Sequence, residues 1–137
     1  MSSTTTIIGN LTRDPELKFL GNDSTVVKLS VAVNRKTKGR DGEWNETTSY
    51  FNVSAFGTLA ENSADSLHKG NRVIVTGRLE QRSWDKEDGT KGTAIELIAD
   101  AIGPDLRFNS ANLTLGRGGK AAESKPKGTP YTGEDAF

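Results

Sequence analysis

Apolar and polar residues alternate in four stretches of this sequence, and no other feature limits the possible folds as strongly. A period of two is typical of a β-strand that packs one face on a core and leaves the other in solvent. The in-phase residues are Val27, Leu29, Val31 and Val33; Phe51, Val53 and Ala55; Val73, Val75, Gly77 and Leu79; and Ile95, Leu97, Ala99 and Ala101. A fifth strand is expected from Thr4 to Leu11, bent at Gly9.

One helix is expected between the second and third of these stretches. Thr58 and Glu61 have the spacing of a capping box, in which the two side chains satisfy free N–H groups of the first turn. The apolar stripe that follows consists of Ala60, Ala64 and Leu67. Gly70 is expected to end the helix after Lys69, which places His68 in the last turn, where a cation helps satisfy the helix C-terminus.

Three strands, one helix and two strands follow one another in the order of a five-stranded OB-fold barrel. The sequence therefore predicts an all-β fold with one short helix. Polar loops at 35–47 and 85–92 predict long hairpins that reach beyond the barrel. From residue 116 the chain loses apolar residues and fills with Gly, Lys, Ser and Pro, a composition typical of a disordered linker. We expect an OB-fold domain over 1–115 and a flexible tail over 116–137 with a short acidic tip.

The charge of the chain is locally uneven although its total is zero. Eighteen basic and 18 acidic residues balance, which argues against a nucleic-acid binder that works by overall charge alone. Four cations nevertheless lie together with no acid among them: Arg35, Lys36, Lys38 and Arg40. This basic cluster either contacts phosphates or forms a solvated hairpin tip, and the sequence leaves both readings open.

Nothing in the sequence has the pattern of a catalytic or metal site. The single histidine, His68, is expected to be structural, and the acidic residues Asp85, Glu87 and Asp88 lie in a polar stretch that predicts a turn. No cysteine is present to form a disulfide or a thiolate site. No apolar run approaches the length of a membrane span or of a signal peptide. We expect a cytoplasmic protein that is not an enzyme and holds no metal or cofactor.

Three aromatic residues fall in the strand phase opposite the core. Tyr50 and Phe56 share one strand, and Trp84 shares the next with arginines. Exposed rings among cations suit unpaired nucleic-acid bases, because the rings stack on bases while the cations hold phosphates. The candidate phosphate-binding residues are Arg35, Lys36, Lys38, Arg40, Arg72, Arg78 and Arg82. On phase alone, however, the rings could equally pack under a loop or at a subunit interface, and Trp44 either anchors its hairpin or stacks on a base.

Five segments of the sequence resemble bacterial single-stranded DNA-binding proteins. They are 8–16 (IGNLTRDPE), 29–35 (LSVAVNR), 51–57 (FNVSAFG), 69–73 (KGNRV) and 77–84 (GRLEQRSW), and they extend the resemblance over about residues 3–108. The resemblance implies an OB-fold homotetramer that binds single-stranded DNA in replication, recombination and repair, at the nucleoid. The stacking positions of that family fall on Tyr50, Phe56 and Trp84.

The sequence departs from this family at one stacking position. A further stacking tryptophan of the family falls near Thr37, which cannot stack, so either that contact is lost or Trp44 replaces it. The stretch 103–108, with Leu113 and Leu115, resembles the actinobacterial branch, in which an additional C-terminal strand clamps neighbouring subunits.

The end of the chain resembles the acidic tip through which the family recruits replication and repair proteins. Here the tip is reduced to Glu134, Asp135, Ala136 and Phe137, with alanine where proline is usual. A specialised paralogue would fit this reduction. The alternatives are an OB-fold module that binds RNA or a protein partner and a small hydrolase on a barrel scaffold, although the hydrolase would need a catalytic cluster that the sequence does not show.

Overall fold

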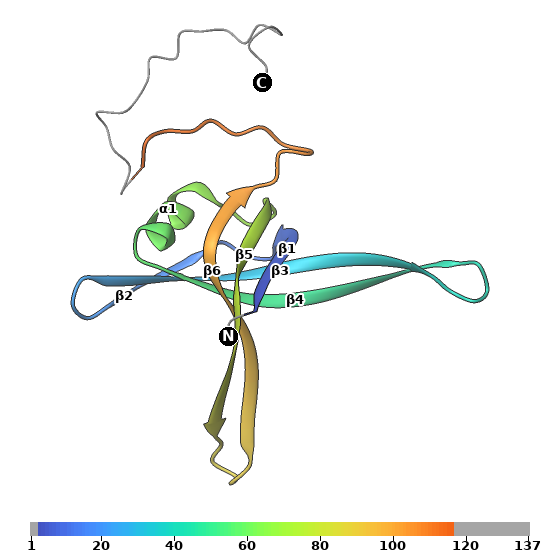
Figure 1. The fold of residues 1–137 in the computed structure, drawn as a ribbon, viewed down its shortest axis with the longest axis horizontal. Helices are drawn as coiled ribbons and strands as arrows, with labels where there is room; N and C mark the ends of the chain where they lie inside the picture. Colours follow the sequence, from blue (N-terminus) through green and yellow to red (C-terminus); the bar gives the residue numbers. More distant parts are fainter. Residues whose placement is uncertain (1–2, 117–137) are drawn as a thin grey trace, which may run out of the picture.

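The computed structural model describes residues 3–116, which form six strands and one helix (Figure 1). In chain order these are β1 (Thr4–Leu11), β2 (Glu16–Leu20), β3 (Ser24–Lys38), β4 (Trp44–Phe56), α1 (Thr58–Ser66), β5 (Arg72–Asp85) and β6 (Lys91–Pro104). The five strands and the helix predicted from the sequence are all present. The strand β2 was not predicted, because five residues are too few for alternation to stand out.

Five of the strands close into a ring through their backbone hydrogen bonds. Antiparallel pairs join β1 to β5, β5 to β6 and β3 to β4, and a short parallel pair joins β4 to β6. The ring is closed where Asn10 and Leu11 of β1 pair with β3. The strand β2 pairs only with β3 and lies outside this ring. The predicted OB-fold architecture is therefore confirmed, with one additional strand beside it.

The inner face of the ring forms the hydrophobic core. Fully buried side chains from four strands meet there, and the largest are Leu29, Leu97, Val27, Val31, Val53, Val73 and Val75. Helix α1 contacts β3 and β4 and adds Ala60 to the same core. The alternation of apolar and polar residues in the sequence arises from this core, because each strand contributes every second residue to it.

The start of the helix differs from the prediction. Its N-cap is Gly57, with a φ of 67°, and no side chain forms a capping hydrogen bond. The backbone N–H of Glu61 donates to the Gly57 carbonyl at 3.1 Å, as in the first turn of any α-helix. The predicted capping box of Thr58 and Glu61 is therefore wrong. A glycine at this position follows β4 directly and makes the sharp, left-handed turn from strand to helix that other residues adopt only with strain.

The helix also ends earlier than predicted. Leu67 is already extended, with φ −110° and ψ 147°, so His68 lies beyond the helix and not in its last turn. Two side chains hold this connection, one from within it and one from a distant segment: the N–H of His68 donates to Asn71 at 2.8 Å, and the N–H of Lys69 donates to Asp14 at 2.8 Å. Hydrogen bonds from outside the helix replace those that further helical turns would have made.

A bulge in β6 changes which residues face the core. Gly77 pairs with Ala99, but the preceding residue of β5 pairs with Ala101, so Asp100 is the extra residue. An extra residue exchanges the two faces of a strand. Beyond the bulge Ile102 packs on the core, whereas Ala101 is exposed. The predicted core position of Ala101 is therefore wrong.

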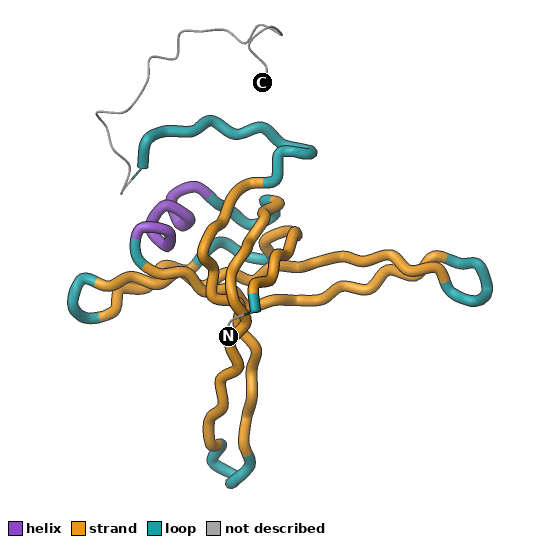
Figure 2. The backbone as a smooth tube through the Cα atoms, in the orientation of Figure 1, coloured by secondary structure: helices purple, strands orange, loops and turns teal. Residues whose placement is uncertain are grey.

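Two hairpins extend from the barrel in different directions as long two-stranded arms (Figure 2). Strand pairing continues to Lys38 and Trp44 in one arm and to Asp85 and Lys91 in the other. Most of the predicted loop at 35–47 is thus strand, with only 39–43 left as a turn, whereas in the predicted loop at 85–92 the strands take up only the ends and 86–90 remain a turn. Side chains in the arms are exposed because no second layer covers them, which explains why Leu79, predicted to face the core, is 43% exposed.

An ion pair joins the end of β6 to the start of β5. The Nε of Arg72 lies 2.6 Å from a carboxylate oxygen of Asp105, and the guanidinium groups of Arg72 and Arg107 lie 5.7 and 5.1 Å from the ring centre of Phe108. The side-chain hydrogen bond from Arg72, followed by that from the Arg107 N–H, lowers the pKa of Asp105 below its usual value. Residues 105–116 form no strand, so the clamp strand implied by the resemblance is not formed within the described part of the chain.

We expect Asp105→Asn to lower the melting temperature near neutral pH and to matter less in acid. Because the folded-state pKa is lowered, the carboxylate stabilises the fold above its unfolded pKa, and this stabilisation is lost as the pH falls through the folded pKa. Thermal unfolding at about pH 7 and about pH 3, followed by circular dichroism, measures the difference. The control is Asp23→Asn, an exposed carboxylate in the β2–β3 turn. A difference of the same size at both pH values would contradict the role of the ion pair.

Candidate nucleic-acid interface

Exposed aromatic rings lie along one side of β4. Trp44, Tyr50 and Phe56 are separated by even numbers of residues, so they point to the same face of the strand. Their exposed fractions are 69%, 70% and 51%. Phe51, one position out of phase, packs against the core instead. The rings therefore lie on the outer face of the barrel and its β3–β4 arm, as the strand phase predicted for Tyr50 and Phe56.

The same outer face continues onto β6 and β5. Asn52 of β4 pairs with Glu96 of β6, which in turn pairs with Glu80 of β5, and side chains of paired residues share a face. Two and four residues beyond Glu80 lie Arg82 and Trp84, and Trp84 is 45% exposed. We call the surface that carries Trp44, Tyr50, Phe56 and Trp84 the aromatic face. It runs from one arm across the barrel to the other arm.

A groove of about 240 Å³ lies on the outer face of the barrel. Its charged and amide lining residues are Arg13, Glu16, Lys18, Lys28, Asn52, Arg82 and Glu96. The ammonium of Lys28 donates to the Ser54 hydroxyl at 2.8 Å and lies 3.3 Å from a carboxylate oxygen of Glu96. Four cations against two carboxylates leave the groove positive, which suits the phosphates of a nucleic acid.

The sequence alone identified only part of this groove. Arg82 was predicted from its phase beside Trp84, but Arg13, Lys18 and Lys28 were not. Lys18 lies on β2, and its approach to the other cations depends on the pairing of β2 with β3, which no local pattern reveals. The available signal was the alternation of Leu17 and Phe19 around Lys18, which is typical of a strand but short.

The basic cluster lies on and beyond the end of β3. Arg35, Lys36, Lys38 and Arg40 are all exposed, and none of them forms an ion pair within residues 3–116. Lys38 pairs across the arm with Trp44, so a cation and a ring of the aromatic face lie side by side. The structure thus brings the predicted stacking residue and a predicted phosphate-binding residue together.

Two predicted phosphate-binding arginines already have acidic partners. Arg72 pairs with Asp105, as described above, at the start of β5 and far along that strand from Trp84. The guanidinium of Arg78 lies 3.1 Å from Glu80 and 4.0 Å from Asp100. Neither arginine therefore offers an unopposed charge, in contrast to Arg82, which forms no ion pair within the described residues.

Thr37 stands near the position at which the family carries a further stacking tryptophan. Thr37 pairs with Asn45 and lies on the opposite side of the arm from Trp44, because neighbouring residues of a strand alternate in direction. Trp44 is too exposed to anchor the hairpin and shares its face with Tyr50 and Phe56. The sequence left open whether Trp44 anchors its hairpin or stacks on a base, and this geometry favours stacking, from the side of the arm opposite Thr37.

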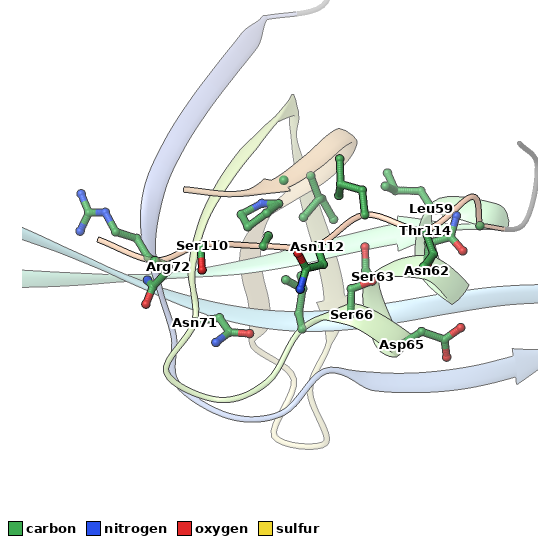
Figure 3. A pocket seen from close by; sticks show the side chains of 18 residues that line it. Leu59, Asn62, Ser63, Asp65, Ser66, Asn71, Arg72, Ser110, Asn112 and Thr114 are labelled. Carbon is green, nitrogen blue, oxygen red and sulfur yellow. The ribbon is translucent and has the colours of Figure 1, made fainter. Parts of the chain in front are cut away.

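A larger groove, of about 520 Å³, lies between α1 and the segment 109–116 (Figure 3). In Figure 3 Asn62 and Ser63 of α1 face Asn112 and Thr114 of that segment. The residues that line this groove are uncharged apart from Asp65 and Arg72. No group of three or more His, Cys, Asp or Glu side chains that could hold a metal occurs in residues 3–116. Within the same residues no helix is long and apolar enough to cross a membrane.

The match to known proteins covers the whole barrel. Residues 2–105 match the model of the family described as the single-strand binding protein family. The chain belongs to this family. Its members are DNA-binding proteins rather than enzymes. The resemblance of the five sequence segments to this family is confirmed.

Individual members of the single-strand binding protein family are similar in sequence and in fold. A single-stranded DNA-binding protein of Paenarthrobacter aurescens is 45% identical over 113 residues, 81% of this chain, which spans 66% of the length of that relative. The small single-stranded DNA-binding protein of Streptomyces coelicolor is 32% identical, with a TM-score of 0.65 over 77% of this chain and 96% of its own. The Plasmodium falciparum SSB in complex with ssDNA shares the fold, at 22% identity and a TM-score of 0.70 over 76% of this chain and 94% of its own.

Proposed function

We propose that this chain binds single-stranded DNA without sequence specificity. Bases stack on the aromatic face, and the cations of the groove and of the β3–β4 arm hold phosphates. The observation that carries the proposal is the single outer face on which four exposed rings lie among cations. Stacking contributes roughly 1–3 kcal/mol per base, so several rings dominate the affinity. A ring stacks on any base, which makes sequence preference slight.

We also propose the wider role that this binding serves. The chain protects single strands in replication, recombination and repair, in the cytoplasm at the nucleoid, and it acts by binding and not by catalysis. In this proposal residues 1–115 form the binding domain and 116–137 the tail. Glu134, Asp135, Ala136 and Phe137, which lie outside the described residues, recruit replication and repair proteins, because an aromatic side chain close to two carboxylates fits an apolar pocket edged by cations.

The proposal includes assembly as a homotetramer. Ile8 and Ile74 are paired across β1 and β5 and remain 42% and 38% exposed. Beyond them, the edge of β1 from Thr4 to Gly9 that faces away from β5 has no partner strand among residues 3–116. Exposed apolar side chains beside a free strand edge support an interface with a second copy. Light scattering of the full chain is expected to give the mass of four copies, and a monomer in solution would contradict this part of the proposal.

The experiment that tests the function is a titration of intrinsic tryptophan fluorescence with oligo-dT, at low and moderate salt. Stacking of Trp44 and Trp84 on bases is expected to quench their emission to saturation and to persist at moderate salt, because salt screens exposed charges but not stacking. Duplex DNA and a single-stranded RNA of the same length are the controls. No quenching, or an equal response to duplex, would overturn the proposal, and a preference for RNA would replace DNA by RNA as the ligand.

Trp84→Ala is expected to weaken oligo-dT binding more than Lys38→Ala at moderate salt. Loss of one stacked base corresponds to an increase in Kd of about 5- to 150-fold. Loss of one exposed cation is expected to cost less and to shrink further as salt rises. Fluorescence anisotropy of a labelled oligonucleotide measures both variants without relying on tryptophan emission. Equal losses, or none for Trp84→Ala, would count against the aromatic face.

Deletion of residues 116–137 is expected to leave the affinity for oligo-dT nearly unchanged. All of the aromatic face and the groove lies before residue 116, so the contacts proposed for DNA remain. The same anisotropy measurement compares the full chain with the shortened one. A large loss of affinity would mean that the tail itself binds DNA through its basic residues, which include Arg117, Lys120, Lys125 and Lys127.

A further inference from the structure

Gly92 is buried in an arm whose other residues are not. Every residue from 78 to 91 is exposed, and so is Thr93, yet Gly92 is shielded from solvent. Its partner across the arm is Trp84, on the adjoining strand β5. The indole of Trp84 therefore covers Gly92, because a paired large side chain is the group that reaches over a glycine in a hairpin.

The indole lies with its face, and not its edge, against Gly92. A Cβ atom placed on Gly92 would lie 2.5 Å from Cε2 of Trp84, 2.6 Å from Cζ2 and 2.8 Å from Nε1. The nearest atom is the ring-junction carbon, and its two bonded neighbours follow at slightly longer distances. An approach in the plane of the ring would bring those two neighbours nearer than the junction carbon. The Cβ position is thus above the ring, and the ring lies across the β6 backbone.

We propose that Gly92 is the positioning residue for Trp84: its missing side chain lets one face of the indole rest on β6 while the other face is presented to a base. The inference rests on the proposed function, since it describes how one stacking ring is held. A ring already fixed before binding loses less freedom when a base stacks on it, which favours affinity. The exposed fraction of 45% agrees with a ring that is covered on one side.

Any side chain at position 92 must displace the ring. Contacts under 3.0 Å are not tolerated by a real Cβ, and the atoms that Gly92 would meet are at the far end of a side chain that can rotate. The backbone is held by pairing on both sides, from Arg82–Ala94 to Asp85–Lys91. The indole therefore moves and the strands stay, so Gly92→Ala changes the stacking surface while the arm remains paired.

Gly92→Ala is tested against Gly103→Ala, its matched control. Gly103 lies in the same strand, and a Cβ there would meet nothing within 4 Å. Both variants carry Trp44→Phe, which leaves Trp84 as the only tryptophan. In the absence of DNA, acrylamide is expected to quench Trp84 fluorescence more strongly in Gly92→Ala than in the Trp44→Phe parent. Gly103→Ala is expected to be quenched to the same extent as that parent. Unchanged quenching in Gly92→Ala would overturn the inference, because the ring would not have moved.

Binding of oligo-dT supplies the second measurement. At moderate salt Gly92→Ala is expected to raise the Kd about three- to tenfold, part of the loss expected for Trp84→Ala, and Gly103→Ala to leave it unchanged. In a Trp84→Ala background Gly92→Ala is expected to have no further effect, because the ring that it displaces is absent. The same factor with and without Trp84 would mean that Gly92 acts independently, and the inference would fail.

Different results would contradict the stacking function of Trp84 and the positioning role of Gly92. If Trp84→Ala leaves the affinity unchanged, the proposed stacking function is wrong. If Trp84→Ala weakens binding but Gly92→Ala does not, stacking stands and only the positioning role of Gly92 is wrong. Thermal unfolding of each variant shows whether the barrel is intact, so a loss of affinity through misfolding is recognised separately.

Discussion

The strand β1 joins the two sides of the barrel at Asn10 and Leu11, directly after Gly9. Asn10 pairs with Arg72 on β5 and also with Ala32 on β3. At Gly9 a Cβ would run into the backbone carbonyl of Ala32 and the side chain of Val31, so the strands approach closely only because glycine stands there. Without this contact the five strands would form an open sheet with a free edge on each side.

Closure of the ring decides where the rest of the molecule can act. A closed ring buries one residue in two of each strand and leaves the alternate residues on a continuous outer surface. The arms extend from this ring with no core of their own, so their exposed rings and cations are held by strand pairing alone. In the proposed function that arrangement places Trp44 on the β3–β4 arm and Trp84 on the β5–β6 arm, with Tyr50 and Phe56 further along β4. The two arms leave the barrel in different directions (Figure 1).

The parts of the fold that depend on alternation were predictable from the sequence. Val27 and Val53 are in the core because each lies in a clear period-two run, and the phase of Trp84 correctly placed it outside. The bulge at Asp100 was not predictable, because it is defined only by the pairing of β6 with β5. The N-cap at Gly57 was not predicted for a related reason. The chain turns sharply out of β4 at this residue, which favours glycine, and the Thr58–Glu61 motif gives no sign of that turn.

The candidate site divides in the same way. Exposure of a ring follows from strand phase, which the sequence contains. Whether a cation is unopposed can depend on a partner far along the chain, such as Asp105 for Arg72, and no local pattern indicates that partner. Arg78 has one partner close in sequence, Glu80, and a second distant one, Asp100. The groove that joins Lys18 to Arg82 exists only once β2 has paired with β3, β3 with β4, β4 with β6, and β6 with β5.

Because the total charge of the chain is zero, base stacking on the rings and phosphate binding by the cations have different roles. A chain with 18 basic and 18 acidic residues has no overall attraction for polyanions, so its cations act over short distances and are screened by salt. Duplex DNA offers phosphates but hides the faces of its bases, whereas a single strand offers both. In the proposed function, selection of single strands therefore comes from the rings, and the cations fix where the backbone runs between them. A ring such as Trp84, held against β6 before any base arrives, is the element that makes this selection independent of charge.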